Sequence, residues 1–159
     1  MVECGGGTST FYLGEMLRAT GRHLVTVEHD PEWAMRLRGL VCTRGLESTV
    51  TVVTAPLAPY TLAHDTPLWY DTGVLTAFFS GQRIDVLLVD GPPAYEQTLS
   101  RARYPALPFF YRYLSPSALI FLDDIDRGGE QAIMRQWNAE FNLALTPARP
   151  WQRIACGRN

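Results

Sequence analysis

Residues 2–10 read VECGGGTST, a short apolar strand that runs into three consecutive glycines and then into hydroxyl residues. Glycine lets the backbone turn tightly and approach a ligand without Cβ contacts. The hydroxyls of Thr8, Ser9 and Thr10 suit the start of a helix, whose first N–H groups are free to bind. This pattern predicts a strand, a binding loop and a helix in that order.

The rest of the chain repeats the alternation. A β-branched run at 23–28 leads into Asp30-Pro31, an N-cap followed by proline at the first helical position. The apolar runs at 84–90 and 118–122 are continuous, as in parallel strands covered on both faces. Residues 55–67 contain three prolines and are expected to form a loop.

Strands that alternate with helices indicate a parallel sheet with helices on both faces. We therefore expect an α/β fold, a Rossmann-like three-layer sandwich whose mostly parallel sheet ends in a C-terminal antiparallel strand pair at about 143–146 and 153–156. The length of 159 residues fits a single domain over residues 1–159.

Composition excludes several functions. All 14 basic residues are arginine, so no lysine is present for a Schiff base or a phosphate-binding P-loop. The net charge of −2 supplies no positive field for nucleic acid. The three cysteines form no C-x-x-C pair, and no apolar run reaches the roughly 18 residues of a membrane span. These features favour a cytoplasmic protein without a membrane or nucleic-acid partner.

Acidic residues stand at the carboxyl ends of four predicted strands: Glu3, Glu28, Asp90 and the pair Asp123-Asp124. In such sheets ligands bind beyond the carboxyl ends of the strands, all of which lie at one edge. The sequence thus predicts a ligand site lined by carboxylates.

The residues around the glycine loop favour a ligand with an ammonium group over a dinucleotide. Position 10 is threonine where a dinucleotide fingerprint has its third glycine, and Glu3 would repel a pyrophosphate but attract an ammonium group. Glu28 follows Gly7 by 21 residues, the usual distance for a carboxylate that accepts ribose hydroxyls. This combination favours a cofactor that carries an amino acid.

Three motifs together, ECGGGTS at 3–9, VEHD at 27–30 and IDVLLVD at 84–90, resemble the class I S-adenosylmethionine-dependent methyltransferases. The resemblance implies that the glycine loop holds the methionine part of S-adenosylmethionine, that Glu28 holds the ribose, and that Ala55 lies beside the adenine. The cofactor-binding residues expected on this basis are Glu3, Gly5, Gly6, Gly7, Ser9, Glu28, His29, Ala55 and Asp90.

A narrower resemblance comes from DGPP at 90–93 and LDDIDR at 122–127, which are similar to the O-methyltransferase branch with catechol-type and polysaccharide enzymes. In catechol-type members these positions bind a divalent metal. The resemblance implies Mg²⁺ or Mn²⁺ at Asp90, Asp123 and Asp124, with Asp124 where the pattern has asparagine. Clustered carboxylates repel one another without a cation, which favours this interpretation; a helix cap at Asp124 is the alternative.

The expected reaction is O-methylation of a small-molecule or sugar hydroxyl, with Asp90 and Asp123 as catalytic residues. Either a metal lowers the hydroxyl pKa or Asp90 removes the proton. We expect His29 to contact the adenosine, and His64 to be structural or solvated.

Two alternatives stay open: a non-catalytic methyltransferase-like domain that binds a cofactor or partner, and a nucleotide-dependent oxidoreductase. The family usually has helices before the first strand, whereas here that strand starts the chain. A homodimer whose second subunit supplies the missing cover is a further expectation.

Overall fold

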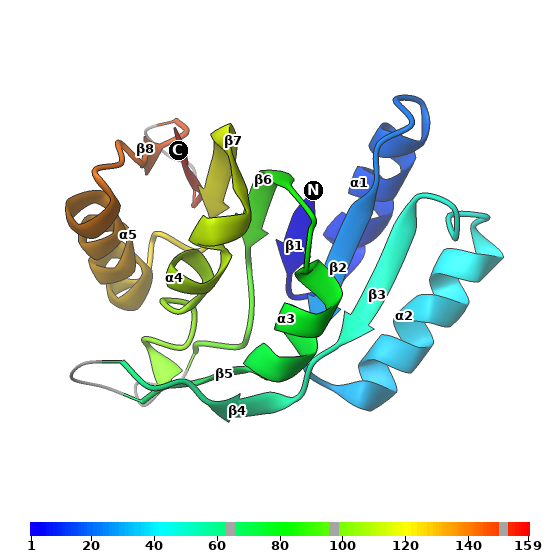
Figure 1. Cartoon of the computed structure of the whole chain (residues 1–159), viewed down its shortest axis with the longest axis horizontal. Coiled ribbons are helices and arrows are strands. Elements are labelled where there is room, and N and C mark those ends of the chain that lie inside the picture. Colours follow the sequence, from blue (N-terminus) through cyan, green and yellow to red (C-terminus); the bar gives the residue numbers. More distant parts are fainter. Residues whose placement is uncertain (63–65, 96–98, 150–152) are drawn as a thin grey trace.

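A computed structural model describes residues 1–62, 66–95, 99–149 and 153–159. Strands and helices alternate along the chain (Figure 1). The elements, in chain order, are β1 (Val2–Cys4), α1 (Thr8–Arg18), β2 (Leu24–Glu28), α2 (Pro31–Thr43), β3 (Val50–Thr54), β4 (Leu57–Pro59), β5 (Leu68–Tyr70), α3 (Thr72–Phe79), β6 (Ile84–Val89), α4 (Ala106–Phe110), the 3-10 helix η2 (Tyr111–Tyr113), β7 (Leu114–Leu122), α5 (Gly128–Phe141), β8 (Thr146–Pro147) and β9 (Ala155–Arg158).

The main sheet has seven strands in the order β3-β2-β1-β6-β7-β9-β8. β1, β2, β3, β6 and β7 are parallel, whereas β9 is antiparallel to β7 and β8 antiparallel to β9. The Rossmann-like α/β fold with a C-terminal antiparallel pair is therefore confirmed. The strand order reverses between β1 and β6, which is where open α/β sheets bind ligands.

The helices pack through two apolar clusters. The smaller one joins α1 and α2 to β2 and β3, with Leu24 and Leu37 fully buried. The larger one joins α3, α4 and α5 to the central strands and includes Phe79, Phe110 and Trp137. Figure 1 shows α1 beside β2 and α2 beside β3 at one end of the sheet, and α4 and α5 near β7 at the other.

The prolines at 55–67 suggested a loop, but the described part of this segment contains a strand, β4. β4 and β5 pair antiparallel as a separate two-stranded sheet. In Figure 1 this small sheet crosses below the carboxyl ends of the central strands. Trp69, fully buried among aromatic rings, anchors it against Phe109 and Phe110. The prolines are tolerated because a two-stranded sheet has only edges.

Aspartate side chains cap the starts of two helices. Asp30 caps α2 as expected, since its carboxylate accepts hydrogen bonds from the backbone of Glu32 and Trp33 at 2.8 and 3.1 Å. Asp71 caps α3 in the same way. No helix in the described part of the chain is long and apolar enough to cross a membrane.

Candidate active site

A cavity of about 630 Å³ opens at the carboxyl ends of the central strands. Its walls come from three backbone segments and from side chains that reach in between them. These are residues 5–9, 28–30 and 90–93, with Trp33, Tyr70, Tyr95, Arg103 and Asp124.

The glycine loop is held by direct contact between two backbones. Gly5 has φ +89°, and a Cβ built on it would lie 3.1 Å from the backbone of Gly91. A Cβ on Gly6 would lie 2.5 Å from Leu37 and 2.7 Å from Thr26. Gly7, in contrast, has no neighbour within 4 Å of such a Cβ. The first two glycines are therefore required by packing, and Gly7 borders open space in the cavity.

Glu3 does not line the cavity, which corrects the expectation that it faces a ligand. It is fully buried beneath the loop. Its carboxylate accepts hydrogen bonds from the hydroxyls of Ser9, Thr10 and Thr26 at 2.5, 2.6 and 2.8 Å. Burial raises the pKa of Glu3, opposed by these three hydrogen bonds. Glu3 thus anchors the start of α1 to β1 and β2, and its position turns its charge away from the cavity.

Glu28 lies in the cavity wall at the end of β2, only 4% exposed. Its Oε1 accepts from the backbone N–H groups of His29 and Asp30 at 2.7 and 3.0 Å, and its Oε2 accepts from Gly6 at 3.2 Å. The ring Nδ1 of His29 lies 2.8 Å from Oε1. One carboxylate therefore joins the end of β2 to the glycine loop, and both Glu28 and His29 border the cavity.

Trp33 contacts the glycine loop, whereas Ala55, expected beside the adenine, lies away from the cavity. α2 buries Ala34, Leu37 and Val41, so Trp33 is rotated away from the core to 37% exposure. Its indole Nε1 donates to the carbonyl of Gly6 at 2.8 Å. Ala55 is fully buried and does not line the cavity; its N–H donates to the carbonyl of Glu28 at 2.8 Å.

Asp90 faces the cavity from the end of β6, and its side chain is 40% exposed. Its Oδ1 lies 3.3 Å from Nη2 of Arg103. Partial burial raises the pKa of Asp90 to about 6; the carboxylates of Asp123 and Asp124 add to the rise, and Arg103 opposes it. A carboxylate with this pKa is ionised at neutral pH and takes up a proton more readily than an ordinary aspartate.

The acidic pair after β7 is not arranged as metal ligands, which corrects the expectation of a metal at Asp90, Asp123 and Asp124. Asp123 is absent from the cavity wall and accepts from the backbone N–H of Asp124 at 2.7 Å. Asp124 forms ion pairs with Arg103, Arg127 and Arg153. Across the described residues, no three His, Cys, Asp or Glu side chains are grouped to hold a metal ion.

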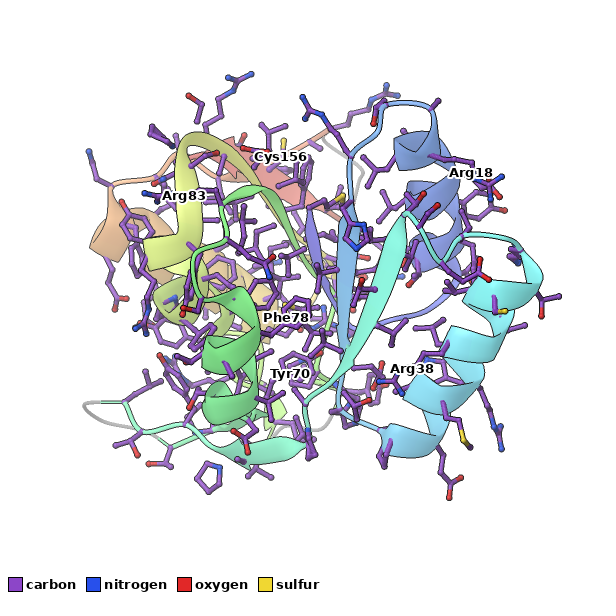
Figure 2. All side chains as sticks on the ribbon, turned by 45° about the vertical axis from the view of Figure 1, so that its right-hand side comes forward. Arg18, Arg38, Tyr70, Phe78, Arg83 and Cys156 are labelled. Atoms are coloured by element: carbon purple, nitrogen blue, oxygen red, sulfur yellow. The ribbon has the colours of Figure 1, made fainter. Side chains whose placement is uncertain are left out.

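Two large buried side chains at the cavity, those of Arg103 and Tyr70, are not among the cofactor-binding, catalytic or metal-binding residues expected from the sequence. Arg103 is 2% exposed, although an arginine beside a predicted site mouth is usually solvated. Tyr70 is 1% exposed, and its hydroxyl has no hydrogen-bond partner in the described structure. Figure 2 shows Tyr70 at the level of the carboxyl ends of the central strands. No local motif marks either residue; His64 lies outside the described residues.

A glycine loop after β1, an acid at the end of β2 and an Asp-Gly-Pro turn after β6 around one cavity define the class I methyltransferase architecture. Comparison agrees: a family model described as a methyltransferase domain matches residues 2–125. The chain belongs to this methyltransferase domain family. No curated protein matches the chain.

Solved structures share the fold over nearly the whole chain. An O-methyltransferase from Bacillus cereus in complex with SAH aligns with a TM-score of 0.69 at 19% identity, over 99% of this chain and 73% of that one. The O-methyltransferase TomG from Streptomyces achromogenes, in complex with SAM, aligns with a TM-score of 0.69 at 14% identity, over 99% of this chain and 71% of that one. The SAH-bound methyltransferase PaMTH1 from Podospora anserina aligns with a TM-score of 0.68 at 14% identity, over 99% of this chain and 70% of that one. The fold is that of S-adenosylmethionine-dependent O-methyltransferases.

Proposed function

We propose that this chain binds S-adenosylmethionine along the glycine loop and Glu28, and transfers its methyl group to a hydroxyl of a small molecule or sugar. The observation that carries the proposal is a single cavity that the glycine loop, Glu28 and Asp90 share. The O-methyltransferases with the same fold, two of them in complex with SAM or SAH, support this cofactor and this acceptor group.

The residues fit the cofactor on three counts. The wall at Gly7 has open space where a side chain would stand. Glu28 presents a carboxylate at the cavity wall, suited to ribose hydroxyls. The buried hydroxyl of Tyr70 at the same cavity lacks a partner, and a bound ligand would supply one. When bound, the cofactor supplies a methyl group activated by a sulfonium.

The chain's own residues have three tasks in this reaction. The rigid Gly5–Gly91 contact keeps the cofactor loop and the Asp-Gly-Pro turn in register, which holds donor and acceptor in line. Asp90 accepts the proton of the acceptor hydroxyl, because it faces the cavity and is ionised at neutral pH. Tyr95, 74% exposed at the rim, offers an aromatic surface to a ring-shaped acceptor.

Calorimetric titration of the protein with S-adenosylhomocysteine, NAD and NADP tests the proposal. We expect binding of S-adenosylhomocysteine alone, and S-adenosylmethionine turnover with at least one member of a panel of phenols, catechols and sugars. Binding of NAD or NADP instead would favour an oxidoreductase. Binding of S-adenosylhomocysteine without any turnover would favour a non-catalytic domain.

A further inference from the structure

The side chain of Arg103 fills the space between the ends of β6 and β7. Its Nη2 lies 3.0 Å from Oδ2 of Asp124 and 3.3 Å from Oδ1 of Asp90. Its remaining N–H groups donate to main-chain carbonyls, Nη1 to Asp123 at 3.3 Å and Nε to Pro92 at 3.4 Å. The guanidinium is thus surrounded by carboxylate and carbonyl oxygens from both strand ends.

Carboxylate and carbonyl oxygens are the ligands that hard divalent cations prefer. These oxygens do not surround an empty ion site, however, because the guanidinium of Arg103 stands between them. Mg²⁺ or Ca²⁺ would need its ligand oxygens at roughly 2.0–2.6 Å from a common centre. Arginine stays protonated in proteins, so Arg103, 2% exposed, is a permanent charge at this position.

Two of the carboxylates around Arg103 are already paired with other arginines. Arg127 lies 2.9 Å from Oδ2 of Asp124, and Arg153 is paired with its Oδ1. The carboxylate of Glu130, 1% exposed, is balanced by two arginines, since its Oε1 lies 3.7 Å from Nη1 of Arg103 and 3.9 Å from Nη1 of Arg127. Of the three arginines at Asp124, Arg103 is the one that also pairs with Asp90, so it is the charge that a divalent ion between these two carboxylates would have to displace.

We propose that Arg103 is a built-in cation that takes the place of a divalent metal between Asp90 and Asp124. It neutralises the two carboxylates, holds Asp90 toward the cavity and makes the site independent of added metal. Arg103 acts through Asp90 and is therefore a positioning residue. The role of Arg103 in positioning Asp90 for methyl transfer rests on the proposed function, whereas its replacement of a metal ion does not.

The test is Mn²⁺ binding, followed by electron paramagnetic resonance, in the wild type and in Arg103→Met and Arg103→Lys. Methionine keeps much of the side-chain length without the charge, and lysine keeps the charge without the planar set of guanidinium N–H donors. We expect no specific Mn²⁺ binding in the wild type or in Arg103→Lys. Arg103→Met should gain Mn²⁺ binding of at least about tenfold higher affinity, because its carboxylates lose their cation. Turnover in the wild type should be unchanged by EDTA.

Arg83→Met is the matched control, since Arg83 directly precedes β6, lies well apart from Tyr70 in Figure 2 and does not line this cavity. It should behave as the wild type. Mn²⁺ bound by the wild type and lost in Asp124→Asn would overturn the proposal, and so would a folded Arg103→Met that binds S-adenosylhomocysteine but gains no Mn²⁺ affinity. If Arg103→Met does not fold, the wild type and Arg103→Lys decide, because Mn²⁺ binding by either contradicts a built-in cation. Failure of S-adenosylhomocysteine binding by the wild type would instead refute the proposed function and leave the Mn²⁺ result standing.

Discussion

Gly5 and Gly91 meet backbone to backbone: a Cβ on Gly91 would lie 2.7 Å from the Cα of Gly5. The two residues are far apart in the sequence, one after β1 and the other after β6. Their contact brings the proposed cofactor loop against the turn that carries Asp90. The close approach leaves no space for a side chain at either position.

Gly91→Ala should therefore destabilise the fold by about 1–3 kcal/mol, the usual cost of overpacking, and should weaken binding of S-adenosylhomocysteine. Urea denaturation and calorimetry measure the two effects. Gly39→Ala is the control, because Gly39 lies within α2 and a Cβ there meets nothing within 4 Å. It should be neutral or stabilise the protein by up to about 1 kcal/mol.

Glu28→Gln should weaken S-adenosylhomocysteine binding by about 1.5–3 kcal/mol, the scale of charged hydrogen bonds to ligand hydroxyls. Thermal stability should also fall, because Glu28 accepts from three backbone N–H groups. Glu32→Gln, a change in the first turn of α2, is the comparison and should leave affinity unchanged. Equal affinity in the wild type and Glu28→Gln would remove Glu28 from the ribose site.

Glu3→Gln is expected to act on stability rather than on charge toward a ligand. Glutamine supplies one acceptor oxygen where Glu3 supplies two for three hydroxyl donors. The loss should cost about 1–3 kcal/mol of unfolding free energy. A variant as stable as the wild type but unable to bind S-adenosylhomocysteine would show that Glu3 contacts the ligand after all.

Asp90 should set the acid limb of the pH–rate profile. Its pKa of about 6 predicts that kcat/KM falls as the pH drops below about 6, because only the ionised carboxylate can accept a proton. Asp90→Asn should lose turnover while retaining affinity for S-adenosylhomocysteine. An active Asp90→Asn variant with the wild-type acid limb would exclude Asp90 as the base.

The same carboxylate predicts a pH-dependent stability. The pKa of Asp90 is raised on folding from 3.8 to about 6, so the folded state holds a proton that the unfolded chain releases. The stability that Asp90 contributes is present below about pH 4 and is lost as the pH rises through 6. Urea denaturation should accordingly show Asp90→Asn gaining stability relative to the wild type between pH 4 and 7. A constant difference across that range would contradict the raised pKa.

Tyr70→Phe separates a ligand contact from a packing role. The hydroxyl of Tyr70 is buried without a partner, so its removal should leave the unliganded protein as stable or more stable by about 1 kcal/mol. Affinity for S-adenosylhomocysteine should fall if the ligand supplies the missing partner. Tyr113→Phe, in the aromatic cluster beside Phe79 and Phe109, is the control and should leave affinity unchanged. Unaltered affinity in Tyr70→Phe would contradict the contact.

Local sequence patterns predicted the central parallel strands, the starts of the first two helices and the edge of the sheet at which the site lies. Continuous apolar runs mark strands buried on both faces, and Asp30-Pro31 marks the start of α2, because both signals depend on neighbours in the chain. Because parallel strands end at one edge of the sheet, the same patterns predicted that Glu28 and Asp90 lie at one site.

The directions of the side chains at that edge depend on contacts between distant segments of the folded chain. β1 is central and buried on both faces, so its alternation could not show that Glu3 turns toward Thr26 rather than the cavity. Arg103 reaches Asp90 across 13 positions and Asp124 across the β6–β7 boundary, a pairing that no local pattern encodes. Whether a cluster of carboxylates is neutralised by a metal ion or by a guanidinium depends on which buried cation the fold brings between them, and that is settled by contacts between distant segments.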